Sequence, residues 1–408
     1  MSNILYISYD GMTDPLGQSQ VLPYLFGLSQ EGHSFNLISF EKPAKFDQHK
    51  EVIQKVCDQN NITWHPLVYH KSPPILSTIY DIRQMRKLAK KLHAEQKIEL
   101  VHCRSYLASI VGLYLKQKHK VPFLFDMRGF WADERVDGNI WNLKNPIFKF
   151  VYKFFKKKEL EYFNNADCVV SLTHKGKEEV LSWPAIKKDI KIEVIPCCAD
   201  MNLFDYTSFN SDELTQIKKQ YGIHEDDYVL IYIGNFSTVY KFDEVLEVYK
   251  SIKKTNLKFL VFSHESQEKF DHFLTESELK SDENIRYGSL PRTEIPKVLS
   301  IADYSIFFCM EGFSRKATSP TRLAEIMGCG LKVIINSGIG DTKEFVEEND
   351  LGYVFNGFNQ SELEAFKKQF TYDKHYDKQK IRNLAITTFE VSYGIKKYAN
   401  VYKQILKS

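Results

Sequence analysis

The sequence lacks several features that would assign it to a special class of protein. Its seven cysteines are an odd number and form no C-x-x-C pair, which argues against a disulfide framework and against a zinc site. No uninterrupted apolar stretch reaches about 18 residues, the length of a membrane-spanning helix. The 55 basic and 52 acidic residues leave a net charge of only +3, which argues against a nucleic-acid partner.

Three further absences narrow the function and the location. The chain has neither a G-x-G-x-x-G nor a Walker motif, which argues against an ordinary dinucleotide-binding or P-loop enzyme. Residues 2–7 carry no basic side chain, and Asp10 follows before a long apolar run can form, so the pattern is not that of a signal peptide. We therefore expect a cytoplasmic protein whose only membrane contact is peripheral, at the inner face of the plasma membrane.

Length and apolar pattern predict two α/β domains. The 408 residues, 43% of them hydrophobic, suffice for two or three domains of about 150 residues. Short apolar runs alternate with helical patterns, as in βαβ units around a parallel sheet. The runs form two series, 3–8, 35–40, 98–102, 122–126, 167–172 and 192–195, then 228–233, 257–262, 285–287, 304–308, 331–335 and 352–355. We predict doubly wound, Rossmann-like domains at 1–200 and 201–388, followed by a helix at 389–408 with one apolar stripe.

Candidate binding residues in the first half follow the apolar runs, because parallel sheets bind ligands at the carboxyl ends of their strands. The loop after the first run leads into a helix through Gly17 and Gln18, and it is either a structural turn or a site where backbone N–H groups face an anion. Arg104 and Arg128 follow two later runs, where a guanidinium either binds a phosphate or carboxylate or pairs with an acidic neighbour. His102 either forms a structural hydrogen bond or faces the substrate.

The most unusual composition lies at residues 146–158, PIFKFVYKFFKKK. On a helix, the aromatic and aliphatic side chains share one arc, and the opposite arc holds Lys149, Lys153, Lys156 and Lys157. Such a helix suits an anionic membrane surface, and residues 148–158 are the candidate contact. It equally suits packing of the apolar arc on its own sheet, with the lysines in water.

In the second half, two segments suit a diphosphate. Gly234 and Asn235 follow an apolar run, where a glycine lets a ligand approach the backbone, and Lys241 nearby can neutralise negative charge.

The second of these segments begins at Ser319. Ser319 precedes Pro320 as the N-cap of a helix would, which predicts an anion site at the amides of Thr321 and Arg322. Basic side chains are unfavourable at a helix start, and a phosphate ligand would explain them.

Together these segments resemble glycosyltransferase family 4, a family of retaining, nucleotide-sugar-dependent enzymes with the GT-B fold. The resemblance rests on residues 195–204, 234–241, 291–303 and 319–330, with 31–33 in the first half, and it covers nearly the whole chain. It implies an acceptor-binding N-terminal domain and a donor-binding C-terminal domain that face each other across a cleft. It also implies that the last helix crosses back to the N-terminal domain.

The resemblance implies roles for single residues. Glu325 would bond the ribose hydroxyls of the donor, and the other expected donor-binding residues are Gly17, Gly234, Asn235, Lys241, Ser319, Thr321 and Arg322. The expected acceptor-binding residues are Gln18, Arg104 and Arg128, and the expected catalytic residues are Asp126, Arg128 and Lys241. Such enzymes usually need no metal, because cationic side chains and helix N-termini take the charge of the leaving group. We therefore expect no metal and no cofactor beside the nucleotide sugar.

The sequence departs from the family's pattern near the transferred sugar. Ala317 stands where the family has the first of two paired glutamates, and Asp126 replaces a common histidine. We expect a retaining glycosyltransferase that acts on a glycan or lipid-linked acceptor in bacterial polysaccharide or glycolipid assembly. The alternatives are a nucleotide-sugar epimerase or a phosphorylase of similar fold, and a catalytically inactive GT-B subunit of a glycan-assembly complex.

Overall fold

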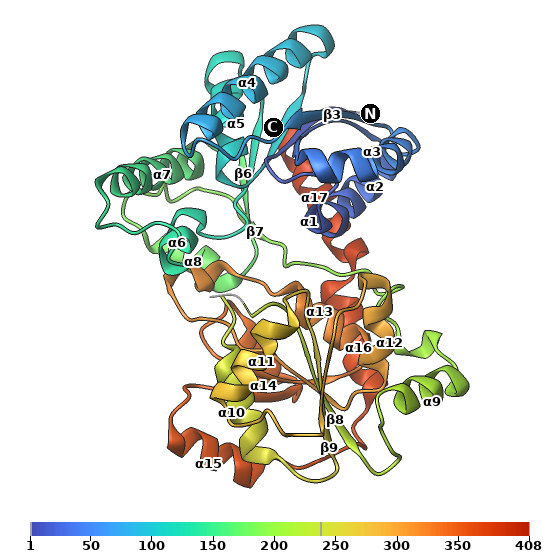
Figure 1. The fold of residues 1–408 in the computed structure, drawn as a ribbon. Coiled ribbons are helices and arrows are strands. Elements are labelled where there is room, and N and C mark those ends of the chain that lie inside the picture. Colours follow the sequence, from blue (N-terminus) through green and yellow to red (C-terminus); the bar gives the residue numbers. More distant parts are fainter. Residues whose placement is uncertain (1, 237–238, 408) are drawn as a thin grey trace. The chain divides into compact units, whose positions relative to one another are not determined.

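The computed structural model describes residues 2–236 and 239–407, which form two compact units (Figure 1). The first unit holds the described residues up to Cys198, the segment Phe313–Ser319 and the residues from Val391 on. The second unit holds Ala199–Gly312 and Pro320–Glu390. Placing 313–319 in the second domain was therefore wrong. This segment contains the 3-10 turn η3 (Phe313–Ala317), which packs on helices of the first unit.

The first unit is built on a seven-stranded parallel sheet of order β3-β2-β1-β4-β5-β6-β7. The strands are β1 (Ser2–Ser8), β2 (His33–Glu41), β3 (Ile62–Val68), β4 (Leu100–Arg104), β5 (Phe123–Asp126), β6 (Cys168–Ser171) and β7 (Ile192–Val194). In the parallel register, Ile4 of β1 lies opposite Phe35 of β2 and Leu100 of β4. Helices cover both faces, so the inner strands are almost continuously apolar, which made them readable in the sequence.

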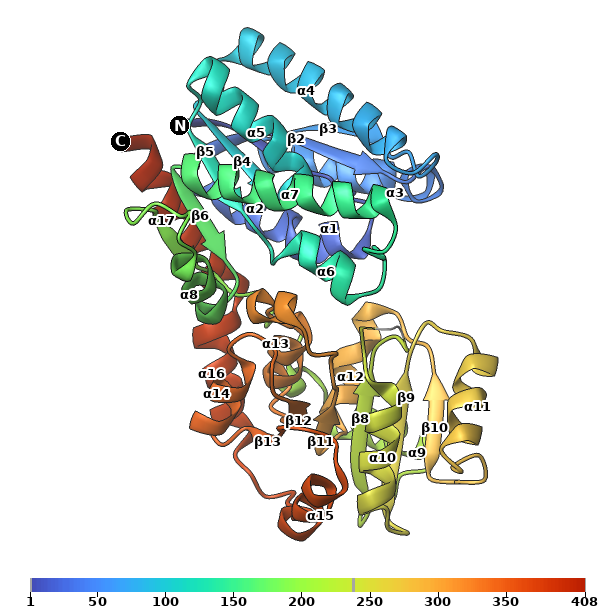
Figure 2. The same cartoon turned by 90° about the vertical axis from the view of Figure 1, so that its left-hand side faces the viewer.

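Helices pack around the first sheet. They are α1 (Pro15–Gln20), α2 (Leu22–Gln30), α3 (Pro43–Asp58), α4 (Leu76–Gln96), α5 (Ser105–His119), α6 (Trp131–Asp137), α7 (Pro146–Asn165), α8 (His174–Ser182) and α17 (Val391–Lys407). Figure 2 shows α4, α5 and α7 side by side on one face of the sheet, and α5 contacts both of the others.

The last helix, α17, packs against α2 (Figure 1). Its apolar stripe is buried at Tyr398, Val401, Tyr402 and Ile405. The helices come so close that a Cβ on Gly27 of α2 would lie 2.1 Å from Ile395 Cδ1. A segment from the far end of the chain thus completes the core of the first unit.

The second unit is built on a six-stranded parallel sheet of order β10-β9-β8-β11-β12-β13. The strands are β8 (Tyr228–Ile233), β9 (Leu257–Phe262), β10 (Ile285–Gly288), β11 (Tyr304–Ile306), β12 (Lys332–Asn336) and β13 (Gly352–Phe355). The helices are α9 (Ser211–Gln220), α10 (Phe242–Ile252), α11 (Gln267–Glu276), α12 (Ile295–Ser300), α13 (Thr321–Gly328), α14 (Thr342–Glu348), α15 (Gln360–Gln369) and α16 (Lys378–Phe389). Each apolar run predicted in this half is one of the strands.

The described residues bear on the cysteines and on membrane-spanning helices. The seven cysteines are buried there as free thiols. In the ranges 2–236 and 239–407, no helix combines the length and the hydropathy that crossing a bilayer requires.

Candidate functional site

A cavity of about 1020 Å³ opens at the carboxyl edge of the first sheet. Its wall includes Tyr9 and Asp10 after β1, Arg104 at the end of β4, Ser105 at the start of α5, and Arg128 after β5. Parallel sheets place their ligands at this edge, and the volume is at the upper end of the range for small-molecule sites. The two arginines predicted from the strand ends thus line one cavity.

Both arginines are held in place by neighbours. The Arg104 side chain is 5% exposed, and its Nε donates a hydrogen bond to Asp10 Oδ2 at 3.3 Å. The Arg128 side chain is 10% exposed, and its Nη2 lies 3.1 Å from Cys197 Sγ. Each arginine therefore has a partner and still faces the cavity.

The backbone at this edge is strained. Ser105 has φ 66° and Arg128 has φ 55°, values in the left-handed region that side chains with a Cβ seldom adopt. Gly129 follows with φ 119°. Such strain gathers at functional sites, where the surrounding fold maintains it. It supports this edge of the sheet as the site.

Asp126, predicted as catalytic, lies behind Arg128 rather than in the wall of the cavity. Tyr398 donates its hydroxyl hydrogen to Asp126 Oδ2 at 3.1 Å, and His102 Nε2 lies 3.5 Å from the same oxygen. The other oxygen, Oδ1, is buried without a hydrogen-bond partner in the described part of the chain, 3.9 Å from Arg128 Nη1. Burial alone would raise the pKa of this carboxyl, but the Arg128 charge and the nearby His102 ring outweigh it and lower the pKa. Asp126 is therefore ionised and anchors the guanidinium.

His102 forms a structural hydrogen bond, which was the first of its two predicted roles. Its Nδ1 lies 2.7 Å from the hydroxyl oxygen of Tyr402 on α17, and the ring is buried. Burial lowers the pKa of His102, which favours the neutral ring. The histidine thus connects β4 to α17 and does not line the cavity.

Gly17 and Gln18 lie on α1, the helix that follows the loop after β1, and neither is in the wall of the cavity. The buried Glu41 at the end of β2 accepts hydrogen bonds from Met12 N at 2.8 Å and Thr13 N at 3.0 Å. Gln18 Nε2 donates to Thr13 O at 3.2 Å. Glu41 was not predicted, although an acidic residue at the end of an apolar strand is a readable signal.

The helix with the unusual composition, α7, is divided between core and cavity. Phe150 and Phe155 both line the cavity, but Phe155 is buried, while Phe150 keeps 72% of its surface exposed. Lys156 does not belong to a solvated lysine face, as the helical arc had suggested. Its Nζ lies 2.8 Å from Asp133 Oδ2 and also contacts the buried Glu159. A helical wheel cannot show this, because Asp133 comes from α6.

In the second unit, Glu325 lies on α13 and forms an ion pair with Arg292, with 2.6 Å between Oε1 and Nη2. The Arg292 guanidinium lies 5.1 Å from the centre of the Phe204 ring. Burial raises the pKa of Glu325, and Arg292 opposes this shift without cancelling it. The ribose-binding role of Glu325 stays a prediction.

The expected diphosphate residues surround the end of β8. A Cβ on Gly234 would lie 2.5 Å from Arg322 Nη2, so the guanidinium occupies the space that a side chain would need. Arg322 Nη1 is buried and has no hydrogen-bond partner among residues 2–236 and 239–407. Asn235 O accepts a hydrogen bond from Tyr232 at 2.7 Å. Ser237 and Thr238, part of the 234–241 segment, lie outside the described residues.

Lys241 stands at the N-terminus of α10. Its Nζ lies 3.2 Å from Glu244 Oε1 and 4.3 Å from the centre of the Phe358 ring. The lysine is thus held by a surface carboxylate and an aromatic ring, and its proposed contact with the donor stays a prediction.

Ser319 is not the N-cap of α13, as had been predicted. The helix begins at Thr321, and Pro320 holds the N-cap position with ψ 112°, outside the helical range. Ser319 belongs to the first unit, where its Oγ accepts a hydrogen bond from Cys197 N at 3.2 Å. Thr321 and Arg322 still form the first turn of the helix.

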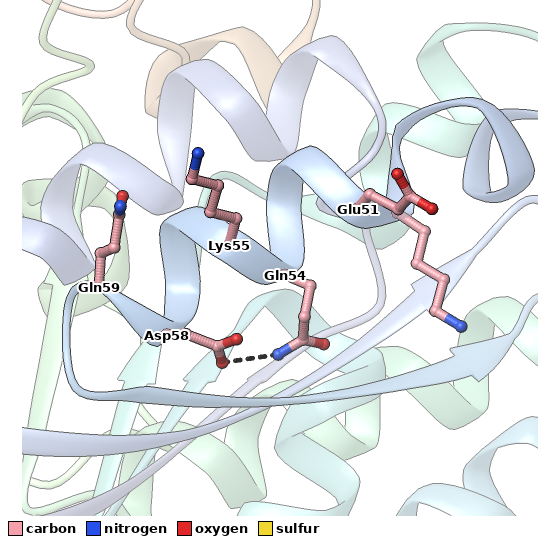
Figure 3. Close-up of a pocket in the computed structure, with 6 residues that line it drawn as sticks. Glu51, Gln54, Lys55, Asp58 and Gln59 are labelled. Carbon is pink, nitrogen blue, oxygen red and sulfur yellow. Dashed lines mark hydrogen bonds between the residues drawn. The ribbon is translucent and has the colours of Figure 1, made fainter.

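A second hollow, of about 530 Å³, runs along α3 (Figure 3). Charged and amide side chains of this helix and of Gln59 just beyond it line the hollow, and Gln54 Nε2 donates to Asp58 Oδ1 at 2.8 Å. It holds no residue predicted for the site.

Two protein-family models match the chain. The model described as Glycosyltransferase Family 4 matches residues 24–203, and the one described as Glycosyl transferases group 1 matches residues 214–383. The chain belongs to glycosyltransferase family 4. The predicted family, GT-B fold and enzyme class are confirmed.

Characterised relatives and solved structures agree with the family. N-acetyl-alpha-D-glucosaminyl L-malate synthase of Bacillus anthracis is 22% identical over 80% of this chain and 77% of that protein. Alpha-monoglucosyldiacylglycerol synthase of Acholeplasma laidlawii is 21% identical over 67% of this chain and 65% of that protein. The structure of Anabaena Alr3699/HepE with UDP and glucose matches 99% of this chain and 100% of that chain, with a TM-score of 0.66 and 13% identity. The last likeness shows the fold alone.

Proposed function

We propose that this glycosyltransferase moves a sugar from a nucleoside diphosphate sugar to an acceptor, with retention of the anomeric configuration. The second unit binds the donor, and the first unit binds the acceptor at its cavity. One observation carries the donor site. On α13, Glu325 lies about one turn from Arg322, whose buried Nη1 lacks a hydrogen-bond acceptor in the described residues. A donor diphosphate would supply that acceptor, and the ribose hydroxyls would donate to Glu325.

The same residues stabilise the leaving group. When the glycosidic bond of the donor breaks, the nucleoside diphosphate departs with added negative charge. Arg322, Lys241 and the N–H groups at the start of α13 are the groups proposed to take up that charge, which requires no metal. The acceptor attacks from the face that the diphosphate leaves, and this gives retention.

On the acceptor side, Arg104 and Arg128 are proposed to bind and orient the acceptor. Asp126 acts through Arg128 as a positioning residue. Asp126 Oδ1 has no hydrogen-bond partner in the described chain and lies 3.9 Å from Arg128 Nη1, so the carboxylate holds the guanidinium by charge attraction.

We also propose that the acceptor is a glycan or lipid-linked molecule used in polysaccharide or glycolipid assembly, at the cytoplasmic surface of a membrane. Two observations support this. The Acholeplasma laidlawii relative is named for a glycosylated diacylglycerol. On α7, Phe150 and Ile147 are exposed beside exposed lysines, as expected of a peripheral membrane contact.

Thermal unfolding with a panel of UDP, GDP, ADP and their sugar derivatives tests the donor site. At a hundred times its dissociation constant, a bound nucleotide adds about 2.7 kcal/mol to the free energy of unfolding. We expect one base to raise the melting temperature of the wild type and of Glu364→Ala, a control on the exposed face of α15, but not of Glu325→Ala. A lack of stabilisation by every nucleotide, or equal stabilisation of Glu325→Ala, would contradict the proposed donor site.

A further inference from the structure

We infer that the cavity of the first unit binds an anionic amphiphile, with its head group at Arg104 and Arg128 and its hydrocarbon chain between α4, α5 and α7. This inference rests on the proposed function, because it names the chemical class of the acceptor: a phosphate or carboxylate group joined to an alkyl chain.

The charged part of the wall favours an anion. Six basic side chains line the cavity, Lys42, Lys71, Arg83, Arg104, Arg128 and Arg135, against three acidic ones, Asp10, Asp14 and Glu134. Asp14 pairs with Lys42 of the wall and also with Lys45, which lies outside it, at 2.8 Å each, so this pairing leaves five basic side chains of the wall against Asp10 and Glu134. Arg104 and Arg128 carry their charges at the strand ends with little exposure to solvent, where a phosphate bonded by both guanidinium groups would be weakly screened.

Much of the remaining wall is apolar, although it also holds polar side chains such as Ser77, Thr78 and Ser319. Ile79 and Ile82 of α4, Leu107 and Ile110 of α5, and Val151 and Phe154 of α7 all line the cavity. These helices lie side by side in Figure 2, and α5 contacts both α4 and α7. Arginine side chains and apolar side chains from three helices thus share one cavity, which a purely polar glycan would not fill.

Exposed apolar side chains show where the chain would lie. Ile79, Phe150 and Phe154 are 40%, 72% and 40% exposed, and all three line the cavity. Single exposed apolar residues are ordinary, but a group of them around one opening marks a binding surface. An alkyl chain that runs from the arginines along this group would remove these side chains from water.

Binding of short alkyl phosphates to the full-length protein tests the inference. Trp131 and Trp141 line the cavity, so their fluorescence reports occupancy. The probes are octyl phosphate and hexyl phosphate, each below its micellar concentration, 1-octanol below its solubility limit, and inorganic phosphate. Because every buried methylene adds a similar increment, octyl phosphate should bind roughly tenfold more tightly than hexyl phosphate. It should also bind more tightly than 1-octanol, which lacks the anion, and than inorganic phosphate, which lacks the chain.

Two double variants separate the cavity from general surface effects. Ile79→Asp with Phe150→Asp changes exposed cavity side chains and should weaken octyl phosphate binding at least tenfold. Val52→Asp with Leu181→Asp changes side chains that are 63% and 46% exposed and lie outside the cavity, and it should leave binding unchanged. Folding of each variant is checked by circular dichroism.

Several results would overturn the inference. They are equal affinities for octyl and hexyl phosphate, equal affinities for octyl phosphate and inorganic phosphate, or unchanged octyl phosphate binding in the cavity variant. Loss of binding to anionic vesicles in that variant, with unchanged octyl phosphate binding, would make the exposed residues a membrane contact instead. None of these measurements needs the donor. Nucleotide stabilisation without alkyl phosphate binding would therefore reject the cavity inference alone, and the reverse would reject the donor site alone.

Discussion

At the scale of single residues, the buried carboxyl of Glu159 couples stability to pH. It accepts a hydrogen bond from Tyr106 and contacts Lys156. Burial raises the pKa of Glu159 from 4.5 to about 6, although Lys156 opposes the shift. Between these values the folded protein holds a proton that the unfolded chain releases, so the free energy of unfolding falls as pH rises. We predict that the wild type loses about 2 kcal/mol relative to Glu159→Gln between pH 4 and pH 7.

Urea unfolding at unit intervals of pH measures this difference. The glutamine keeps the shape of the side chain and cannot titrate, so other ionisable groups affect both proteins alike and cancel. A difference that stays constant with pH, or that changes in the opposite direction, would contradict the prediction.

How far single residues were predictable depended on sequence distance. Arg104 and Arg128 could be assigned to one edge because each directly follows an apolar strand. The partners of Asp126 and His102 could not be assigned, because Tyr398 and Tyr402 lie 272 and 300 positions away along the chain. No local pattern records such a contact, and the order of the elements must be known first.

At the scale of elements, the loop between β1 and α1 depends on Gly17. A Cβ there would lie 2.2 Å from Gly11 O and 2.6 Å from Met12 Cα, and backbone atoms cannot move aside as a flexible side chain can. Helix propensity alone would favour alanine by up to about 1 kcal/mol, but overpacking costs about 1–3 kcal/mol. We predict that Gly17→Ala lowers the free energy of unfolding by about 1–2 kcal/mol, measured by urea unfolding.

Gly357→Ala is the matched control for this substitution. The nearest heavy atom to its new Cβ is Asn359 Nδ2 at 3.8 Å, so its effect should stay within about 0.5 kcal/mol. Equal effects of the two substitutions would contradict the prediction, because they would mean that the loop backbone moves away from the new Cβ with no loss in the free energy of unfolding.

Elements were predictable where one periodicity dominated. Inner strands, apolar on both faces, were found in both sheets. The edge strand β3 was missed, because His65 and Pro66 interrupt its apolar pattern, and an edge position tolerates a proline. The predicted start of α13 was one residue too early. A Ser-Pro pair is compatible with proline as the first helical residue and also with proline as the N-cap, and here Pro320, with ψ 112°, is the N-cap.

At the scale of the whole molecule, each unit is built from more than one segment of the chain. It leaves the first unit after Cys198, returns for Phe313–Ser319 and returns again at Val391. The apolar pattern restarts once, so it indicates two domains. It cannot assign a short returning segment, because η3 is placed by contacts with α6 and α8.

Because α17 supplies core side chains to the first unit, a substitution in this helix should destabilise the first unit and not the second. Tyr402 is buried against β1 and β2 neighbours such as Phe35, and its hydroxyl contacts His102. Replacing a buried aromatic by alanine costs about 3–5 kcal/mol, and here it also removes the hydroxyl partner of His102 Nδ1. We predict that Tyr402→Ala speeds amide hydrogen exchange in β1 and β4 and leaves β8 and β12 unchanged. Phe366→Ala, in the core of the second unit, should give the reverse pattern. Equal acceleration in both units by either variant would mean that they unfold as one cooperative body, so that a contact made by the last helix stabilises strands of both sheets.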